Sequence, residues 1–126
     1  MLPLQCMPRK ESILRQKSER FADRIVKFHH YVSKQNESVM SKQIYRSGTS
    51  IGANIAESIN AQSVADFINK LSIALKEANE TDYWLSRIHN DSLVDDKGYV
   101  SMKNDLDELI KMLVSSIKTA RKNDEQ

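Results

Sequence analysis

The sequence predicts an all-α fold, an antiparallel up-down-up-down four-helix bundle, and three observations support this. Gly and Pro are scarce, at 3 and 2 of 126 residues, which disfavours a turn-rich β fold. Apolar residues recur at helical spacing in four stretches. The polar connections between these stretches are short, so consecutive helices become antiparallel neighbours. We expect one bundle domain over residues 12–122, with tails at 1–11 and 123–126.

The first two predicted helices differ in how strongly their own residues favour helix. The first spans 12–34 with Ser12 as its N-cap, and its apolar stripe is Leu14, Phe21, Ile25, Phe28 and Val32. The second spans 38–59 and contains two Gly and several Ser residues, which disfavour helix. Its stripe is Ile44, Gly48, Ile51, Ile55 and Ile59. Tertiary packing must therefore stabilise the second helix.

The third and fourth predicted helices have longer apolar stripes. The third spans 63–90, and Ser63 with Asp66 resembles a capping box at its start. Its stripe is Phe67, Leu71, Ala74, Ala78, Thr81, Leu85 and Ile88. An acidic loop at 91–98 precedes the fourth helix at 100–121, whose stripe is Met102, Leu106, Leu109, Leu113, Ile117 and Ala120. Four stripes of this kind suffice for one bundle core.

Two helices carry features that a lone bundle does not need. On the third helix, residues outside the core stripe predict a subunit interface, since Trp is enriched at such contacts: Ile73, Glu77 and Trp84. The alternative is a wide core stripe with one exposed Trp. On the second helix, small polar residues replace the Lys and Glu of an ordinary solvated face. We expect this polar stripe to pack closely against another helix: Ser47, Ser50, Asn54 and Glu57.

The basic residues are concentrated in the first third of the chain. Residues 1–46 carry 10 basic and 4 acidic side chains, a net +6, and residues 47–126 carry 9 and 13, a net −4. Four cations share one side of the first helix, with Arg15 just before them, and such a pattern can neutralise phosphates: Lys17, Arg20, Arg24 and Lys27. A solvated helix face is the alternative.

No candidate for catalysis or metal binding has the necessary neighbours. The single cysteine, Cys6, has no base near it in sequence, and it favours a reducing compartment. None of the three histidines follows a Glu by three residues, as a di-metal carboxylate site in a bundle requires. Glu57 and Glu80 are either a paired acid and base or structural carboxylates at a packed interface, and we favour the structural role. We therefore expect no cofactor, no metal and no enzymatic activity.

A longer string extends these patterns to a known family. The string Gln43-Ile-Tyr-Arg-Ser-Gly-Thr-Ser-Ile-Gly-Ala-Asn-Ile-Ala-Glu57, followed by Asp66-Phe67, Ile73-Ala74 and Glu80-Thr-Asp-Tyr-Trp-Leu85, resembles the family of 23S rRNA intervening-sequence proteins. The resemblance covers about residues 21–113. It implies a four-helix bundle that assembles into a homopentamer, and it implies a relation to accessory proteins of diversity-generating retroelements, which bind nucleic acid and a reverse transcriptase.

Carried over by position, the resemblance makes Ser50, Asn54 and Glu57 the polar motif of the second helix and Glu80 the acidic position of the third. Ser58 departs from the family pattern, since Gly or Ala commonly stands there, and the net charge of +2 is low for the nucleic-acid-binding relatives. We expect a cytoplasmic homo-oligomer, a pentamer by resemblance, that binds RNA or DNA through the first helix. The alternative is a protein-interaction scaffold with no nucleic-acid role.

Overall fold

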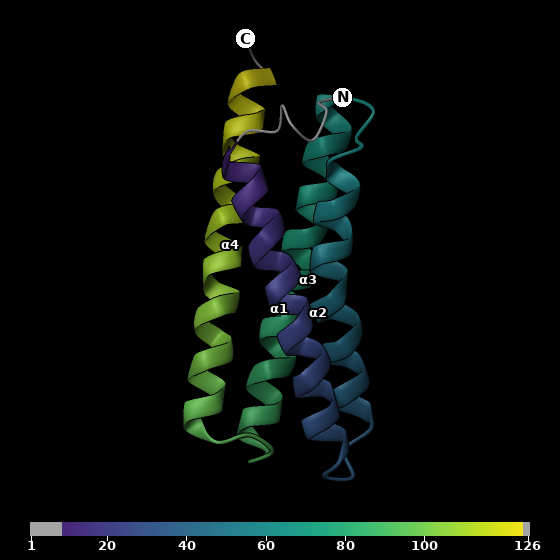
Figure 1. Ribbon diagram of the computed structural model, residues 1–126, viewed down its shortest axis with the longest axis vertical. Coiled ribbons are helices and arrows are strands. Elements are labelled where there is room, and N and C mark those ends of the chain that lie inside the picture. Colours follow the sequence, from purple (N-terminus) through teal and green to yellow (C-terminus); the bar gives the residue numbers. More distant parts are fainter. Residues whose placement is uncertain (1–8, 125–126) are drawn as a thin grey trace.

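The computed structural model describes residues 9–124, with side chains from Ile13 onward. It contains four helices and no strand in that range: α1 (Arg9–Ser33), α2 (Val39–Ser58), α3 (Val64–Asn90) and α4 (Asp96–Asp124). Figure 1 shows them running alternately up and down the long axis. The predicted all-α four-helix bundle is confirmed. Cys6 lies outside the described residues.

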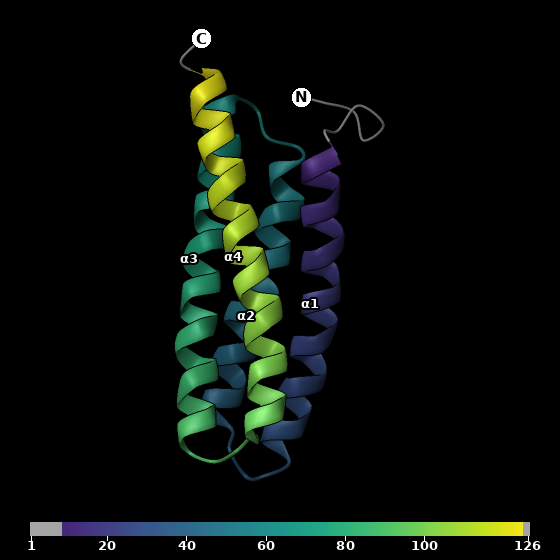
Figure 2. The same ribbon diagram turned by 90° about the vertical axis from the view of Figure 1, so that its left-hand side faces the viewer.

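The helices form a ring in which each contacts two neighbours. Among the described residues α1 packs against α2 and α4, and α3 packs against α2 and α4, whereas the Cα atoms of the diagonal pairs do not come within 8 Å of each other. Figure 2 shows α4 in front of α2, between α3 on the left and α1 on the right, and tilted relative to them. α2 packs most extensively against α3, and α1 packs least against α4. The α1–α4 seam therefore depends more on its polar contacts than the other seams do.

The buried core consists of the four predicted stripes. Every predicted stripe residue is buried except Ile59, Phe67 and Ala120, which are half-buried and lie at or near the ends of their helices. Gly48 of α2 faces the side chain of Ile25 on α1 directly, since a Cβ built there would be 2.7 Å from Cγ1 of Ile25. Close packing thus accounts for a helix whose own residues disfavour helix.

Three expected helix boundaries were wrong. Ser12 is not an N-cap, because α1 is already helical from Arg9. α4 begins at Asp96 rather than at about residue 100, because the Asp95 carboxylate accepts a hydrogen bond from the Gly98 N–H at 2.7 Å and caps the helix earlier. At the other end, α4 continues to Asp124, so residues 123 and 124 are helical rather than part of a tail.

Local hydrogen bonds and backbone conformation set the start of α3 at one end of the bundle and the two loops at the other end. Ser63 Oγ accepts a hydrogen bond from the Asp66 N–H at 3.0 Å, as predicted, while the Asp66 carboxylate accepts one from the Gln62 N–H at 3.1 Å. Asn36 adopts a left-handed backbone conformation with φ of 63°, which Asn tolerates and which turns the chain after α1. Gln35 Nε2 then donates to the Leu93 carbonyl at 2.8 Å and ties the α1–α2 loop to the α3–α4 loop.

Candidate functional site

The predicted basic stripe on α1 is divided by the structure into two sides. On the inner side, Arg24 donates to the Asp105 carboxylate at 2.6 Å and to the Ser101 hydroxyl at 2.8 Å. Lys17 forms an ion pair with Glu108, one turn further along α4. These charge-assisted contacts join α1 to α4 along their sparsely packed seam. Lys17 and Arg24 are therefore placed as links between helices.

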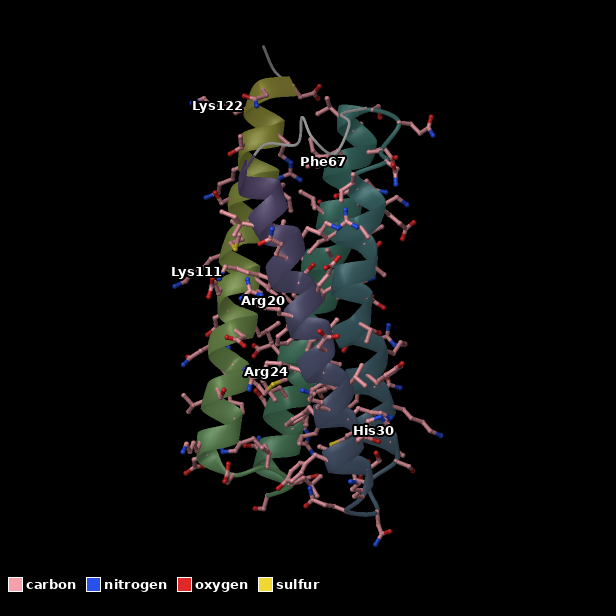
Figure 3. All side chains as sticks on the ribbon, viewed as in Figure 1. Arg20, Arg24, His30, Phe67, Lys111 and Lys122 are labelled. Atoms are coloured by element: carbon pink, nitrogen blue, oxygen red, sulfur yellow. The ribbon has the colours of Figure 1, made fainter. Side chains whose placement is uncertain are left out.

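The outer side of α1 holds the cations that remain available. Arg15 pairs with Glu19 within α1 at 3.3 Å. Arg20 and Lys27 are exposed, and no ion pair to either is found among the side chains of residues 13–124. Lys34, the first residue after α1, still donates its backbone N–H to the His30 carbonyl at 3.1 Å. It follows Lys27 by seven residues, as Lys27 follows Arg20, so all three share one side. Figure 3 shows Arg20 and Arg24 on the α1 side of the bundle.

We call Arg20, Lys27, Tyr31 and Lys34 the outward surface of α1. Tyr31 is 54% exposed and stands one turn beyond Lys27 on the same side, so an aromatic ring accompanies the three cations. Asp23 is exposed between Arg20 and Lys27 and reduces the local charge. Sequence reasoning placed the cations on one helix, but it did not separate Lys17 and Arg24 from this surface or add Lys34 to it.

The polar stripe of α2 makes one direct buried contact with α3. Ser47 and Thr81 are both fully buried, and their hydroxyl oxygens lie 3.0 Å apart. Thr81 also donates to the Glu77 carbonyl at 2.8 Å, so its single proton is used there and Ser47 donates to Thr81. By contrast, Ser50 and Asn54 bond to carbonyls of their own helix at 2.6 and 2.8 Å. Ser47 is therefore the stripe residue that bonds directly to α3.

The two candidate carboxylates, Glu57 and Glu80, lie far apart along the axis of the bundle. Glu57 is 3.5 Å from Lys70 Nζ, and Glu80 pairs with Arg46. Arg46 and Glu57 are eleven positions apart on α2 (57 − 46), which is about 16 Å along the axis. Since Glu80 lies beside Arg46, the acid–base pair left open by the sequence does not form. Each carboxylate instead forms an ion pair with a cation of the α2–α3 pair, Glu57 with Lys70 and Glu80 with Arg46.

Arg46 joins the predicted interface residues to the polar stripe. Its guanidinium is 3.2 Å from the Glu77 carboxylate and also pairs with Glu80. Ile73 and Trp84 lie one turn before Glu77 and one turn after Glu80, on the same row of α3, and both are half-buried. We call Ile73, Glu77 and Trp84, with Ser50 and Asn54 beside them, the α2–α3 surface. The role of Arg46 was missed because it depends on the alignment of two helices.

The Trp84 side chain is incompletely satisfied within one chain. Its ring meets Tyr83 edge-on, with centroids 5.0 Å apart. Its indole nitrogen is shielded from solvent and has no hydrogen-bond partner among the described residues. A buried donor of this kind costs free energy unless an acceptor is supplied. Trp84 thus contributes a ring edge to the α2–α3 surface, while its indole N–H faces inward and bonds to none of the described residues.

The histidines are used in local contacts. His29 Nδ1 lies 2.9 Å from the Ser41 carbonyl, so that nitrogen donates. His89 Nε2 contacts the Asp96 carboxylate at 2.7 Å, and its ring stacks on Tyr99 at 4.1 Å. Among the side chains of residues 13–124, no group of three or more His, Cys, Asp or Glu could hold a metal ion. None of the four described helices has an apolar stretch of the length needed to span a membrane.

Comparison with known proteins places this chain in a family. Residues 10–115 match the profile of the family described as 23S rRNA-intervening sequence protein. The chain belongs to this family. A crystal structure of a protein of unknown function from the S23 ribosomal protein family of Bacteroides thetaiotaomicron has the same fold, with a TM-score of 0.84 and 55% identity. The match covers 86% of this intervening-sequence protein and 98% of that chain. A comparison with curated proteins finds no match.

Proposed function

We propose that this intervening-sequence protein is a non-catalytic cytoplasmic homo-oligomer that binds RNA, or a ribonucleoprotein, through the outward surface of α1. The observation that carries the proposal is the row of Arg20, Lys27 and Lys34, which is exposed and spaced by seven residues. Phosphates are bound by such cations, and Tyr31 offers a ring on which an unpaired base can stack. The family membership agrees with an RNA-related role.

The charge of one subunit limits the affinity that this surface can give. A net charge of +2 and the exposed Asp23 leave a modest positive potential. An assembly with several copies of the surface increases the local potential and adds avidity. The proposed RNA binding therefore depends on oligomerisation of this protein.

Gel-shift titration with 23S rRNA fragments at two salt concentrations tests the RNA proposal. We expect binding at about 50 mM salt that weakens steeply as salt rises. The double variant Arg20→Glu/Lys27→Glu should weaken binding and reduce the salt slope by about one for each cation lost. The matched control is Arg87→Glu/Lys97→Glu, which changes the total charge equally on exposed residues elsewhere.

Two outcomes would overturn the RNA proposal. One is the absence of any shift at about 50 mM salt, where phosphate contacts are strongest. The other is an equal loss of binding in both double variants, which would indicate a response to total charge alone. Either result would favour the alternative, a protein-interaction scaffold with no nucleic-acid role.

We further propose that the oligomer forms through the α2–α3 surface and has five subunits, as the family resemblance implies. The half-buried apolar side chains of Ile73 and Trp84, on one row of α3, support this choice. Native mass spectrometry is expected to show pentamers for the wild type and smaller species for Ile73→Asp. Tyr83→Asp, next to Trp84 but 57% exposed, is the control. A wild type that is only a 14.5 kDa monomer contradicts the proposal.

A further inference from the structure

A second surface, independent of the proposed RNA and oligomer contacts, lies on the outer side of the α3–α4 pair. Lys103 Nζ is 2.9 Å from the Asp82 carboxylate, which sets the register of these antiparallel helices. Leu75 of α3 lies two turns (seven residues) before Asp82, and Ile110 of α4 lies two turns after Lys103. Because the two helices are antiparallel, Leu75 and Ile110 therefore lie opposite each other. Both are half-buried, as is Val114 on the following turn of α4. These residues form a short apolar strip at the seam.

The strip borders a shallow depression of about 440 Å³ on α4. Its lining combines aliphatic side chains with lysines and hydroxyl residues: Ile110, Lys111, Val114, Ser115, Lys118 and Thr119. Lys111 and Lys118 are exposed, and Lys111 points away from the bundle in Figure 3, as does Lys122 further along the same helix. The depression therefore has an apolar floor and a cationic edge.

The charge of α4 changes along its length. Residues 96–108 include four acidic side chains, several of which are paired with α1, α3 or Lys103. Residues 110–123 include four cations and no acid: Lys111, Lys118, Arg121 and Lys122. On α3 the neighbouring residues 67–76 also contain no acid, and Lys76 is exposed. The apolar strip thus lies in a region that attracts anionic groups without a competing internal carboxylate.

We propose that this surface binds an amphipathic helix of a partner protein, with acidic residues flanking the apolar stripe of that helix. An apolar strip of about two turns accepts side chains at i, i+3 or i+4 and i+7 of such a helix. The carboxylates of the partner would meet Lys76, Lys111 and Lys118, so the charge pattern selects the partner as well as attracting it. Such a partner helix would contact both the apolar floor and the cationic edge of the depression.

Two other occupants use only part of this surface. Single-stranded nucleic acid would contact the lysines, but its bases stack on aromatic or Arg side chains, and the depression is lined by none among the described residues. A second copy of the chain offers acids on α4, but Asp105 and Glu108 are already paired with cations of α1. An acidic amphipathic helix therefore fits the residues best.

Fluorescence anisotropy with a synthetic peptide tests this inference. The probe is a labelled helix of about five turns with Leu at core spacing and Glu on both flanks, and its control is a permuted peptide of the same composition. We expect the amphipathic peptide to bind about tenfold or more tightly than the permuted one. Lys111→Glu/Lys118→Glu and, separately, Val114→Asp should each weaken binding about tenfold, whereas the matched control Lys34→Glu/Lys97→Glu should not.

Three results would overturn the inference. They are equal binding of the two peptides, binding that neither variant at the surface changes, and binding of a labelled oligouridylate that depends on Lys111 and Lys118 while the peptide does not bind. Circular dichroism checks that each variant remains folded. If Val114→Asp unfolds the protein, the exposed lysine pair still decides the test. Failure of RNA binding through α1 would leave this inference standing, since the two surfaces share no residue.

Discussion

The two glycines of α2 should respond in opposite ways to the same substitution. At Gly48 a new Cβ would lie 2.7 to 2.8 Å from three side-chain atoms of Ile25, which is itself fully buried. At Gly52 the nearest atom, the Ser18 carbonyl oxygen, is 3.7 Å away, an ordinary van der Waals contact. Gly48→Ala therefore tests the close approach of α1 and α2, and Gly52→Ala is its matched control.

The magnitudes follow from two opposing effects. Replacing Gly by Ala within a helix stabilises it by about 1 kcal/mol. Overpacking a full core costs about 1–3 kcal/mol, and the upper half applies at Gly48 because Ile25 is β-branched and enclosed. We expect Gly48→Ala to lower the free energy of unfolding by about 1–2 kcal/mol, or several degrees in melting temperature. Gly52→Ala should raise it by up to about 1 kcal/mol.

Urea unfolding at one fixed protomer concentration measures both variants, since oligomerisation would otherwise shift the apparent stability. A double-mutant cycle with Ile25→Val removes one of the three crowded atoms and should reduce the cost of Gly48→Ala. Equal effects at Gly48 and Gly52, or no coupling between Gly48→Ala and Ile25→Val, would refute the close approach as the reason for a glycine at position 48.

Three further predictions concern polar contacts. Ser63→Ala removes the N-cap of α3 and should cost about 1 kcal/mol by urea unfolding; an unchanged midpoint would mean that the cap contributes nothing. Thr81→Val leaves the buried hydroxyl of Ser47 without its partner and should cost about 1–3 kcal/mol, whereas Ser47→Ala/Thr81→Val should cost less than the two single changes added together. The carboxylates of Asp82 and Asp107 raise the pKa of Lys103, so its stabilisation is present below the unfolded lysine pKa of about 10.4 and is lost as pH rises through the higher folded pKa. Melting temperatures from pH 9 to about 12 should therefore decline less for Lys103→Met than for the wild type, and parallel declines would contradict this linkage.

The sequence alone determined the helices, the core and the family of this protein. Apolar periodicity is a local property, so the stripe from Leu14 to Val32 could be read without knowing its neighbours. The N-cap at Ser63 was predictable for the same reason, because its partner Asp66 is three residues away. At Ser12 this reasoning failed, since a residue that can cap a helix can also continue one when the preceding residues are helical.

Only the tertiary structure decided which charged residues are paired and which surfaces remain available. The alignment of α1 with α4 uses Arg24 and leaves Arg20 exposed, although both belong to the same sequence pattern. The alignment of α2 with α3 separates Glu57 from Glu80 and brings Arg46 to Glu77. The physical reason is that axial register between helices depends on packing along their whole length, and no short stretch of sequence contains that information.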